Sequence, residues 1–268
     1  MLVVTLGDLL LDVIVRLREP LASGADAEAA TLAAPGGQAA NVAAWVAALG
    51  GQARCVARRG DDAAGVVLAA ELHVRRVELV GPAAGTNGVV VSIVAPDGER
   101  TMASDRGTAT GLEPDDLDPE WFACDFLHIS GYALLASPID DAAMRAAELA
   151  RSRGARVSID LSAWTRIRAH GPERFREQLA TLAPEVVFGN EGEWDELGLV
   201  SGMRVVKRGP HGFDVVRGGV TERCQARDTS VMDTTGAGDA LAAGFLVGGP
   251  ELALEAAARC VAQPGAMP

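Results

Sequence analysis

The sequence predicts an α/β protein whose mostly parallel sheet is covered by helices on both faces. Apolar β-type runs alternate with alanine-rich runs long enough for helices, an alternation typical of βαβ units. Hydrophobic residues make up 49% and charged residues 22% of the 268 residues, which is the composition of a globular protein. A chain of this length can bury a large core as one domain or as one domain with an appendage.

The expected elements of this body follow one another in a regular order. Strands are predicted at residues 2–6, 53–57, 126–130, 156–160, 185–188 and 204–207, and a hairpin at 212–216 and 220–224. Helices are predicted at 39–49, 62–72, 138–151, 172–182, 236–247 and 251–262. Local features support several boundaries: Gly50 ends the first helix, acidic residues lie near the start of the second, and Pro138 opens the third.

Two β-rich segments have no accompanying helix and break this alternation. Residues 13–18 and 29–33 flank a loop of small residues, and residues 88–95 and 100–104 flank Pro96-Asp97-Gly98, a hairpin turn. The pattern leaves two alternatives open. The segments form either one small sheet that projects from the body or two separate surface hairpins.

Charge and composition exclude several classes of function. The sequence has 24 Lys and Arg against 36 Asp and Glu, a net charge of −12, which argues against nucleic acid or an anionic membrane as partner. No apolar run reaches the roughly 18 residues that a membrane span needs. The four Cys and four His lack metal-ligand spacing, so neither a zinc site nor a disulfide framework is expected, and a cytoplasmic location is predicted. The apolar start carries Asp8 and Asp12 without a basic segment, which favours a buried strand over a signal peptide.

The strongest functional motif is the run from Asp233 to Asp239. Its small residues Gly236, Ala237 and Gly238 open a helix, so that free N–H groups and the helix dipole can hold an anion. An anion there disfavours a carboxylate beside it, so Asp239 is expected to have a chemical role, such as accepting a proton from an attacking hydroxyl. The alternative is a glycine-rich loop with Asp233 as an ordinary helix cap and Asp239 as a helix-start acid.

Two further motifs are candidates for binding a polar substrate. Gly36 and Gly37 precede a helix, and Asn41 lies one turn into it, although Asn is a poor helix former. Asp12 follows Gly7-Asp8 near the end of the first strand, where open α/β sheets bind ligands. A carboxylate there suits pairs of substrate hydroxyls. The alternatives are a tight turn with a solvent-facing Asn and a loop acid that serves solubility.

Polar side chains also follow the later strands. The spacing of Asn190 and Glu193 suits Mg²⁺, although a turn followed by helix-start acids is equally compatible. Lys207 and Arg208 place two cations at a strand end, where they either meet a phosphate or lie in a solvated turn. His128 lies within a predicted strand and is interpreted as a core residue.

Together these motifs resemble the ribokinase-like (PfkB) family of carbohydrate kinases over nearly the whole chain. The matching motifs are Gly7-Asp8 with Asp12, Gly36-Gly37-x-x-x-Asn41, Gly60-Asp61-Asp62 with Gly65, Asn190-x-x-Glu193, Gly209-x-x-Gly212 and Asp233-Thr-Thr-Gly-Ala-Gly-Asp239. The last motif is highly specific and the second moderately so. The resemblance implies a doubly wound α/β domain over residues 1–268, with a small β-sheet lid from approximately 13–35 and 82–106.

The resemblance also implies ATP-dependent phosphorylation of a hydroxyl on a small sugar or sugar acid. Asp239 would be the general base, and the N–H groups of Gly236, Ala237 and Gly238 the anion hole. The implied substrate-binding residues are Asp12, Gly36, Gly37, Asn41 and Arg106. The implied nucleotide-binding residues are Asn190, Lys207, Gly209, Gly212, Thr235, Gly236 and Gly238. Asn190 and Glu193 would organise Mg²⁺, and a monovalent cation is a further candidate cofactor.

The acceptor stays open at this point. Gln38 supplies no cation for a substrate phosphate, which argues against a sugar phosphate. Arg106 resembles a carboxylate-binding Arg of sugar-acid kinases, or it pairs with Asp105. A nucleoside kinase and a catalytically silent sugar-binding relative are the alternatives, whereas a dinucleotide-dependent oxidoreductase lacks its G-x-G-x-x-G after the first strand. An exposed lid edge suggests a homodimer formed through the lid.

Overall fold

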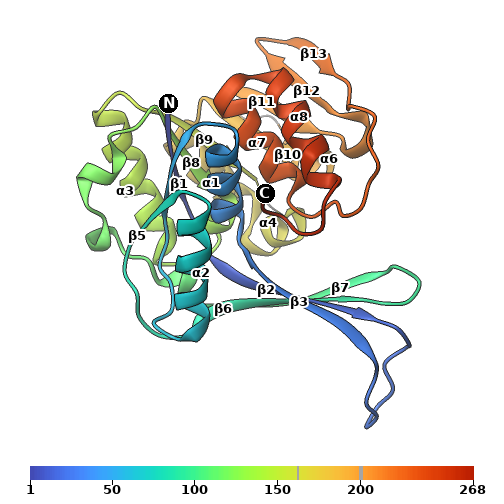
Figure 1. Ribbon diagram of the computed structural model, residues 1–268. Coiled ribbons are helices and arrows are strands. Elements are labelled where there is room, and N and C mark those ends of the chain that lie inside the picture. The colour runs from blue at the N-terminus through green and yellow to red at the C-terminus, as the bar shows by residue number, and fades with distance from the viewer. Residues whose placement is uncertain (162, 199–201) are drawn as a thin grey trace.

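Two sheets organise the fold (Figure 1). Over residues 1–161, 163–198 and 202–268, which the computed structural model describes, the chain forms a nine-stranded sheet and a separate four-stranded sheet. The large sheet has the strand order β13-β12-β11-β10-β9-β8-β1-β4-β5. Its strands are β1 (Leu2–Leu6), β4 (Gln52–Val56), β5 (Val77–Val80), β8 (Phe126–Ser130), β9 (Arg156–Asp160), β10 (Val186–Asn190), β11 (Met203–Lys207), β12 (Phe213–Arg217) and β13 (Val220–Cys224).

The large sheet is doubly wound around β1. This strand pairs in parallel with β4 on one side and β8 on the other, and parallel pairing continues outward to β5 and β11. Within the described residues, antiparallel pairing in this sheet is confined to β12, which pairs with β11 on one side and β13 on the other. Because the chain winds in both directions from β1, the carboxyl ends of the central strands open a crevice where such sheets bind ligands.

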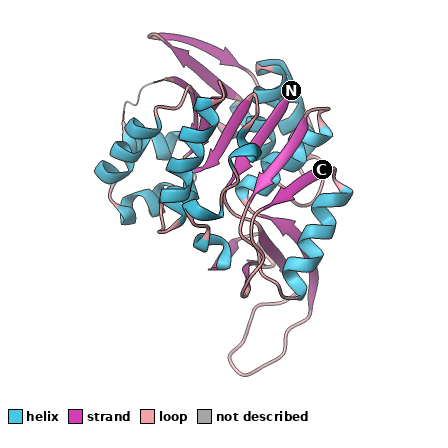
Figure 2. Ribbon diagram, turned by 90° about the vertical axis from the view of Figure 1, so that its left-hand side faces the viewer, coloured by secondary structure: helices cyan, strands magenta, loops and turns pink. Residues whose placement is uncertain are grey.

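Helices cover both faces of the large sheet, and Figure 2 shows them on either side of its strands. One hydrophobic cluster joins the sheet to α1, α2, α7 and α8, and a second joins it to α3, α4, α5 and α6. The bounds are α1 (Gln38–Ala48), α2 (Ala63–Val74), α3 (Ile139–Ser152), α4 (Trp164–His170), α5 (Pro172–Leu182), α6 (Glu191–Leu197), α7 (Ala237–Gly248) and α8 (Pro250–Val261). None of the helices in the described part of the chain is long and apolar enough to cross a membrane.

The small sheet, here called the lid sheet, consists of β2 (Leu10–Leu17), β3 (Ala29–Gly36), β6 (Asn87–Val94) and β7 (Arg100–Gly107). Each hairpin is antiparallel, and parallel pairing of β2 with β6 joins the two into one sheet in the order β3-β2-β6-β7. The alternative of two separate surface hairpins is therefore wrong, and the doubly wound body with a small sheet is confirmed. The lid sheet projects from the body at the carboxyl end of β1 (Figure 1).

The expected elements of the body are all present, with ends that shift by a few residues at most. Among the strands and α-helices of the described body, β5, α4 and α6 were not expected. The strand has four residues and each helix seven, lengths at which an apolar period is hard to recognise. His128 is fully buried and its Nδ1 lies 3.0 Å from Ser158 Oγ, which confirms its interpretation as a core residue.

Candidate active site

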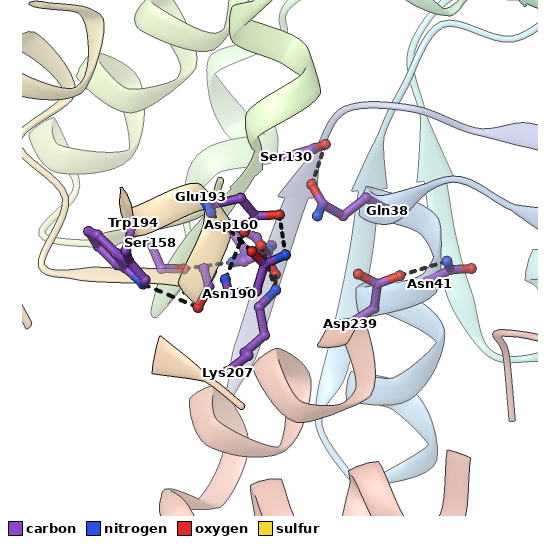
Figure 3. A network of polar contacts seen from close by, with 12 residues as sticks. Gln38, Asn41, Ser130, Ser158, Asp160, Asn190, Glu193, Trp194, Lys207 and Asp239 are labelled. Carbon is purple, nitrogen blue, oxygen red and sulfur yellow. Dashed lines mark hydrogen bonds and ion pairs between the residues drawn. The ribbon is translucent and has the colours of Figure 1, made fainter. Parts of the chain in front are cut away.

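The candidate site lies where the carboxyl ends of the central strands meet the start of α7. Parallel strands bring these ends to one edge, so β9, β10 and β11 present Asp160, Asn190 and Lys207 beside each other. Asp239 approaches from the first turn of α7 and Asn41 from α1 (Figure 3). The fold therefore gathers polar groups from five elements at one place.

The start of α7 is an open cradle of backbone N–H groups. Gly236 caps the helix in the left-handed region, with φ of 77°, and no side chain caps the helix. A Cβ on Gly236 would lie 2.6 Å from both Cα and Cβ of Ala266, so glycine is required here. The amides of Gly236, Gly238 and Asp239 have no acceptor within the described residues, which leaves them free for an anion. The amide of Ala237, an expected member of the anion hole, donates instead to Thr234 O at 3.3 Å.

Asp233 organises the loop that leads into this cradle. Its Oδ1 accepts hydrogen bonds from the amide of Thr235 at 2.9 Å and from Thr235 Oγ1 at 2.6 Å. Its Oδ2 accepts from the amide of Gly265 at 3.2 Å. The interpretation of Asp233 as an ordinary helix cap is therefore wrong, because Gly236 holds the cap position and Asp233 ties the loop to the chain after α8.

Asp239 is half-buried in the first turn of α7, and Asn41 holds its carboxylate in place. Asn41 Nδ2 donates to Asp239 Oδ2 at 2.7 Å, across 198 positions of sequence. Burial and then the Asp160 charge raise the pKa of Asp239 to about 7, against the opposing effects of Asn41 and Lys207. Asn41 is itself buried, and its Oδ1 has no partner within the described residues, so the alternative of a solvent-facing Asn41 is wrong. A carboxylate tuned to neutral pH beside an anion cradle suits a general base.

Asp12 lies directly over the glycines that precede α1. It is on β2 at the root of the lid sheet, and a Cβ on Gly36 would come within 2.2 Å of Asp12 Oδ2. Burial raises the pKa of Asp12 to about 6, and the Arg100 charge lowers it. Gly37 then caps α1, which carries Asn41 on its first turn. Asp12 is therefore a half-buried residue of a strand, whereas the alternative was a solvated loop acid.

Arg106 contacts Asp8 and Tyr132 and not Asp105. Its guanidinium forms an ion pair with the buried carboxylate of Asp8 and lies 3.9 Å from the centroid of the Tyr132 ring. Asp105 Oδ1 accepts instead from the amide of Gly107 at 2.9 Å. Arg106 was expected either to contact substrate or to pair with Asp105. The site instead presents the Arg106 guanidinium already paired with the Asp8 carboxylate. Sequence reasoning missed Tyr132. The available clue was that Tyr132 is the only Tyr in the sequence.

Asn190 and Glu193 form a reciprocal cap at the start of α6. Asn190 Oδ1 accepts from the amide of Glu193 at 3.0 Å, while Glu193 accepts from the Asn190 amide at 2.8 Å and from Nδ2 at 2.7 Å. The helix-start interpretation of Glu193 is confirmed. Burial and then Asp160 raise the pKa of Glu193 to about 7, although Lys207 opposes them.

These oxygens suit Mg²⁺ chemically, but they do not form a closed metal site. Among residues 1–161, 163–198 and 202–268, no three His, Cys, Asp or Glu side chains are grouped to hold a metal ion. Mg²⁺ commonly keeps several waters and takes further ligands from substrate phosphates. The residues present therefore fit an ion that enters with a nucleotide, and the assignment of Asn190 and Glu193 to Mg²⁺ stays a prediction.

Lys207 and Arg208 point to different partners. Lys207 Nζ donates to both carboxylate oxygens of Asp160, at 2.8 and 2.7 Å (Figure 3). Arg208 Nε donates to Asp214 Oδ2 at 2.7 Å, and the same guanidinium pairs with Glu191. Gly209 and Gly212 flank the turn between β11 and β12 that follows these two cations. Sequence reasoning missed Asp160, although an Asp that ends a strand at this edge of the sheet was a usable clue.

The lid sheet reaches the cradle through Arg100, which sequence reasoning also missed. Its Nη1 donates to Thr235 Oγ1 at 2.6 Å, and its Nε donates to Ser92 Oγ at 2.6 Å. The first contact joins β7 to the loop before α7 across 135 positions of sequence. Arg16 of β2 also approaches Asp233, at 3.9 Å. Arg100 therefore links the position of the lid sheet to the loop that shapes the anion cradle.

Comparison with known proteins identifies the family. The family model described as pfkB family carbohydrate kinase matches residues 1–267. A fructokinase of Klebsiella pneumoniae is 31% identical over 253 residues, which cover 83% of this chain and 79% of that protein. An ATP-dependent ribose-1-phosphate kinase of Halopiger xanaduensis is 32% identical over 278 residues, 96% of this chain and 90% of that protein.

Solved structures share the fold. The crystal structure of adenosine kinase from Sinorhizobium meliloti superposes with a TM-score of 0.88 at 26% identity, over 99% of this chain and 95% of that one. A putative ribokinase II from E. coli in complex with ATP and Mg²⁺ has a TM-score of 0.82 at 22% identity, over 99% and 94%. With the family model matching almost every residue, this chain belongs to the pfkB family of carbohydrate kinases.

Proposed function

We propose that this protein transfers the γ-phosphoryl group of ATP to a hydroxyl of a small sugar or sugar acid. The observation that carries the proposal is the position of Asp239, which accepts from Asn41 at 2.7 Å in the first turn of a helix that no side chain caps, and its raised pKa of about 7 supports this. Membership of the family and the names of two relatives, a fructokinase and an ATP-dependent ribose-1-phosphate kinase, support a sugar as acceptor and ATP as donor.

The transfer itself requires positioning and charge neutralisation more than covalent chemistry. The acceptor hydroxyl gives its proton to Asp239 while its oxygen forms a bond to the γ-phosphorus. The bond from that phosphorus to the bridging oxygen breaks, and ADP leaves. The free amides at Gly238 and Asp239 stabilise the charge on the transferring group, and Asn41 keeps the base oriented.

Nucleotide and metal are proposed to occupy the side of the site formed by β10 and β11. Asn190, Lys207, Gly209, Gly212 and Thr235 are the proposed nucleotide contacts, beside the cradle glycines. Bound Mg²⁺ would neutralise the phosphates of ATP. The Asn190–Glu193 pair would hold that ion through its waters, and the hydrogen bonds between the two residues, which fix their orientation, support this role. Dependence on a monovalent cation stays a prediction.

The surroundings of Arg106 favour neutral hydroxyl groups over a carboxylate. Asp8 already neutralises the guanidinium, so a substrate carboxylate would have to displace a buried ion pair. A paired donor and acceptor instead matches a sugar hydroxyl, which both donates and accepts. The same contact covers the Tyr132 ring with Arg106, which takes away a stacking partner that a nucleoside base would use. We therefore rank neutral sugars first, sugar acids second and nucleosides third.

The test is ADP release from Mg-ATP across neutral sugars, sugar phosphates, sugar acids and nucleosides, with Asp239→Asn in parallel. We expect turnover with one class and a loss of about 10²–10⁴-fold in the variant, the usual contribution of a positioned base. Calorimetry with ATP accompanies the panel. ATP binding without turnover on any acceptor would favour a silent sugar-binding relative, and turnover that survives in Asp239→Asn would contradict the assigned base.

A further inference from the structure

Lys207 is the only lysine among the 24 Lys and Arg residues of the sequence. Arginine serves at every other cationic position, including surface ion pairs where lysine would do equally well. The single ammonium group lies at the end of β11, within the candidate site. An ammonium is a compact point charge with three donors, whereas a guanidinium is a broad planar fork. We therefore expect the ammonium of Lys207 to have a role that the 23 Arg side chains do not have.

Asp160 holds the ammonium in a defined place. Nζ donates to both of its oxygens, at 2.8 and 2.7 Å, and the Asp160 side chain is completely buried. The contact spans β10, which lies between β9 and β11 in the sheet. Burial opposes the charge of Lys207, but Asp160 and Glu193 outweigh it and raise the pKa of the ammonium. Lys207 is therefore a charged group at neutral pH with little freedom to move.

The ammonium also faces the anion cradle. A Cβ added to Gly238 would lie 3.1 Å from Nζ, so the charge rests against the first turn of α7. Within the described residues, Asp160 is the one hydrogen-bond acceptor of Lys207, so one of its three N–H groups is uncommitted. The ammonium thus lies beside Gly238, whose amide has no acceptor within the described residues. An anion in the cradle can meet it without disturbing the ion pair.

We propose that Lys207 donates this N–H to the transferring γ-phosphoryl group and that Asp160 is the positioning residue that aims it. The proposal rests on the kinase function proposed above and extends it. The added charge stabilises the transition state, where the phosphoryl group is no longer bonded fully to either oxygen. Such a contact raises kcat and leaves the KM of the sugar unchanged. The competing interpretation, a structural ion pair that merely braces β9 against β11, makes no such prediction.

The test compares Lys207→Met with Arg54→Met, a matched control. Arg54 is likewise a strand cation paired with a carboxylate of the same sheet, Glu78, with side-chain exposure of 17% against 16% for Lys207. We expect kcat to fall about 10²–10³-fold in Lys207→Met, the cost of removing one preorganised donor, with an unchanged sugar KM. Arg54→Met keeps its kcat. Equal kcat values for Lys207→Met and the unmodified enzyme would overturn the proposal.

The pH profile separates a charge at the reaction centre from a mere brace. Lys207 lowers the pKa of Asp239 and Asp160 raises it, so Lys207→Met shifts the acidic limb of kcat upward and Asp160→Asn shifts it downward. The charged and titratable groups around Asp239 are Asp12, Tyr132, Asp160, Lys207 and Cys260. If the acidic limb of kcat moves in the same direction in both variants, or moves in neither, the assigned roles are wrong.

Two further measurements cover a variant that fails to fold. Methylammonium added to Lys207→Ala should restore part of the lost kcat, whereas a structural role predicts no rescue. On the unmodified enzyme, an ATP analogue with an intact γ-phosphate should protect Lys207 from acetylation, read by peptide mass, and ADP should not. Equal protection by both nucleotides would overturn the contact. Absence of any turnover by the unmodified enzyme would overturn the kinase function and this proposal together, whereas turnover with full activity in Lys207→Met overturns this proposal alone.

Discussion

Replacing Asp239 with Asn is expected to make the protein more stable at pH 8 while it removes turnover. The pKa of this carboxyl rises from 3.8 to about 7 in the folded chain, chiefly because it is buried. A rise of about 3 pH units at 1.36 kcal/mol per unit corresponds to at most about 4 kcal/mol. The folded state therefore holds this proton more tightly than the unfolded chain does.

The sign of the effect on stability follows from linkage. Because the folded pKa lies above the unfolded one, the stabilisation is fully present below about pH 4 and is lost as pH rises through about 7. The side-chain amide introduced by Asp239→Asn has no ionisable proton and can still accept from Asn41, so the variant avoids this loss. We expect equal Tm values near pH 4 and a gain of about 5 °C or more for the variant at pH 8, since each kcal/mol shifts Tm by about 2–4 °C at this chain length.

Thermal unfolding of both proteins from pH 4 to 8 measures this difference. Asp141→Asn, which removes an exposed carboxylate from the first turn of α3, is the control and should show no such divergence. A Tm difference that is the same at every pH would refute the reasoning, because the cost would then not come from ionising a buried group. The variant should also lose about 10²–10⁴-fold in kcat, as a missing general base does.

Three other perturbations test the remaining parts of the site. Gly236→Ala would place a Cβ 2.6 Å from Ala266 at a φ of 77°. The rate of ADP release should therefore fall at least about 100-fold, and Tm should drop. Wild-type kinetics in this variant would mean that the cradle is not needed. Arg100→Met removes the 2.6 Å contact from the lid sheet to Thr235, so ATP hydrolysis without an acceptor should rise relative to transfer, and an unchanged ratio would show that this contact does not help to exclude water. The kcat of the unmodified enzyme should rise with pH through about 7, as Asp239 ionises, and a flat profile from pH 5.5 to 8.5 would contradict its role as base.

The lid sheet offers a separate test of the predicted dimer. Its outer strands β3 and β7 form the two edges of the sheet, and Leu32 and Met102 on them are about half exposed. An open edge with apolar side chains suits pairing with a second copy. Sedimentation at micromolar concentration that shows only monomer would contradict a dimer formed through the lid.

Local patterns sufficed to predict most of the body but not the lid sheet. Each βαβ unit is encoded by a nearby strand, turn and helix, so β8, β9 and α5 lie where periodicity places them. The pairing of β2 with β6 joins segments more than 70 residues apart, and nothing local in either segment specifies the other. Periodicity alone could therefore not decide between one sheet and two hairpins.

Local sequence patterns also reveal only part of the candidate site. The glycines around Asp239 form a local sequence signature, and Asn41 stands out because Asn is unusual on a first helical turn. Asp160 has only its place at the end of a predicted strand, and Arg100 carries no local signature. Their significance comes from partners 47 and 135 positions away, Lys207 and Thr235, and only the assembled sheets bring these groups together.

Two strands of the lid sheet, β2 and β3, lie between β1 and α1 in the chain, so in the proposed kinase the lid sheet would couple the binding of sugar and ATP. The chain leaves the body after β1, passes Asp12 in β2, and returns through β3 to Asn41, while β7 reaches Thr235 at the cradle. A sugar that draws the lid down would tighten the phosphate side by some factor. Reciprocity then requires ATP to tighten sugar binding by the same factor, so a calorimetric cycle closed around the ternary complex would measure the coupling free energy between the two ligands.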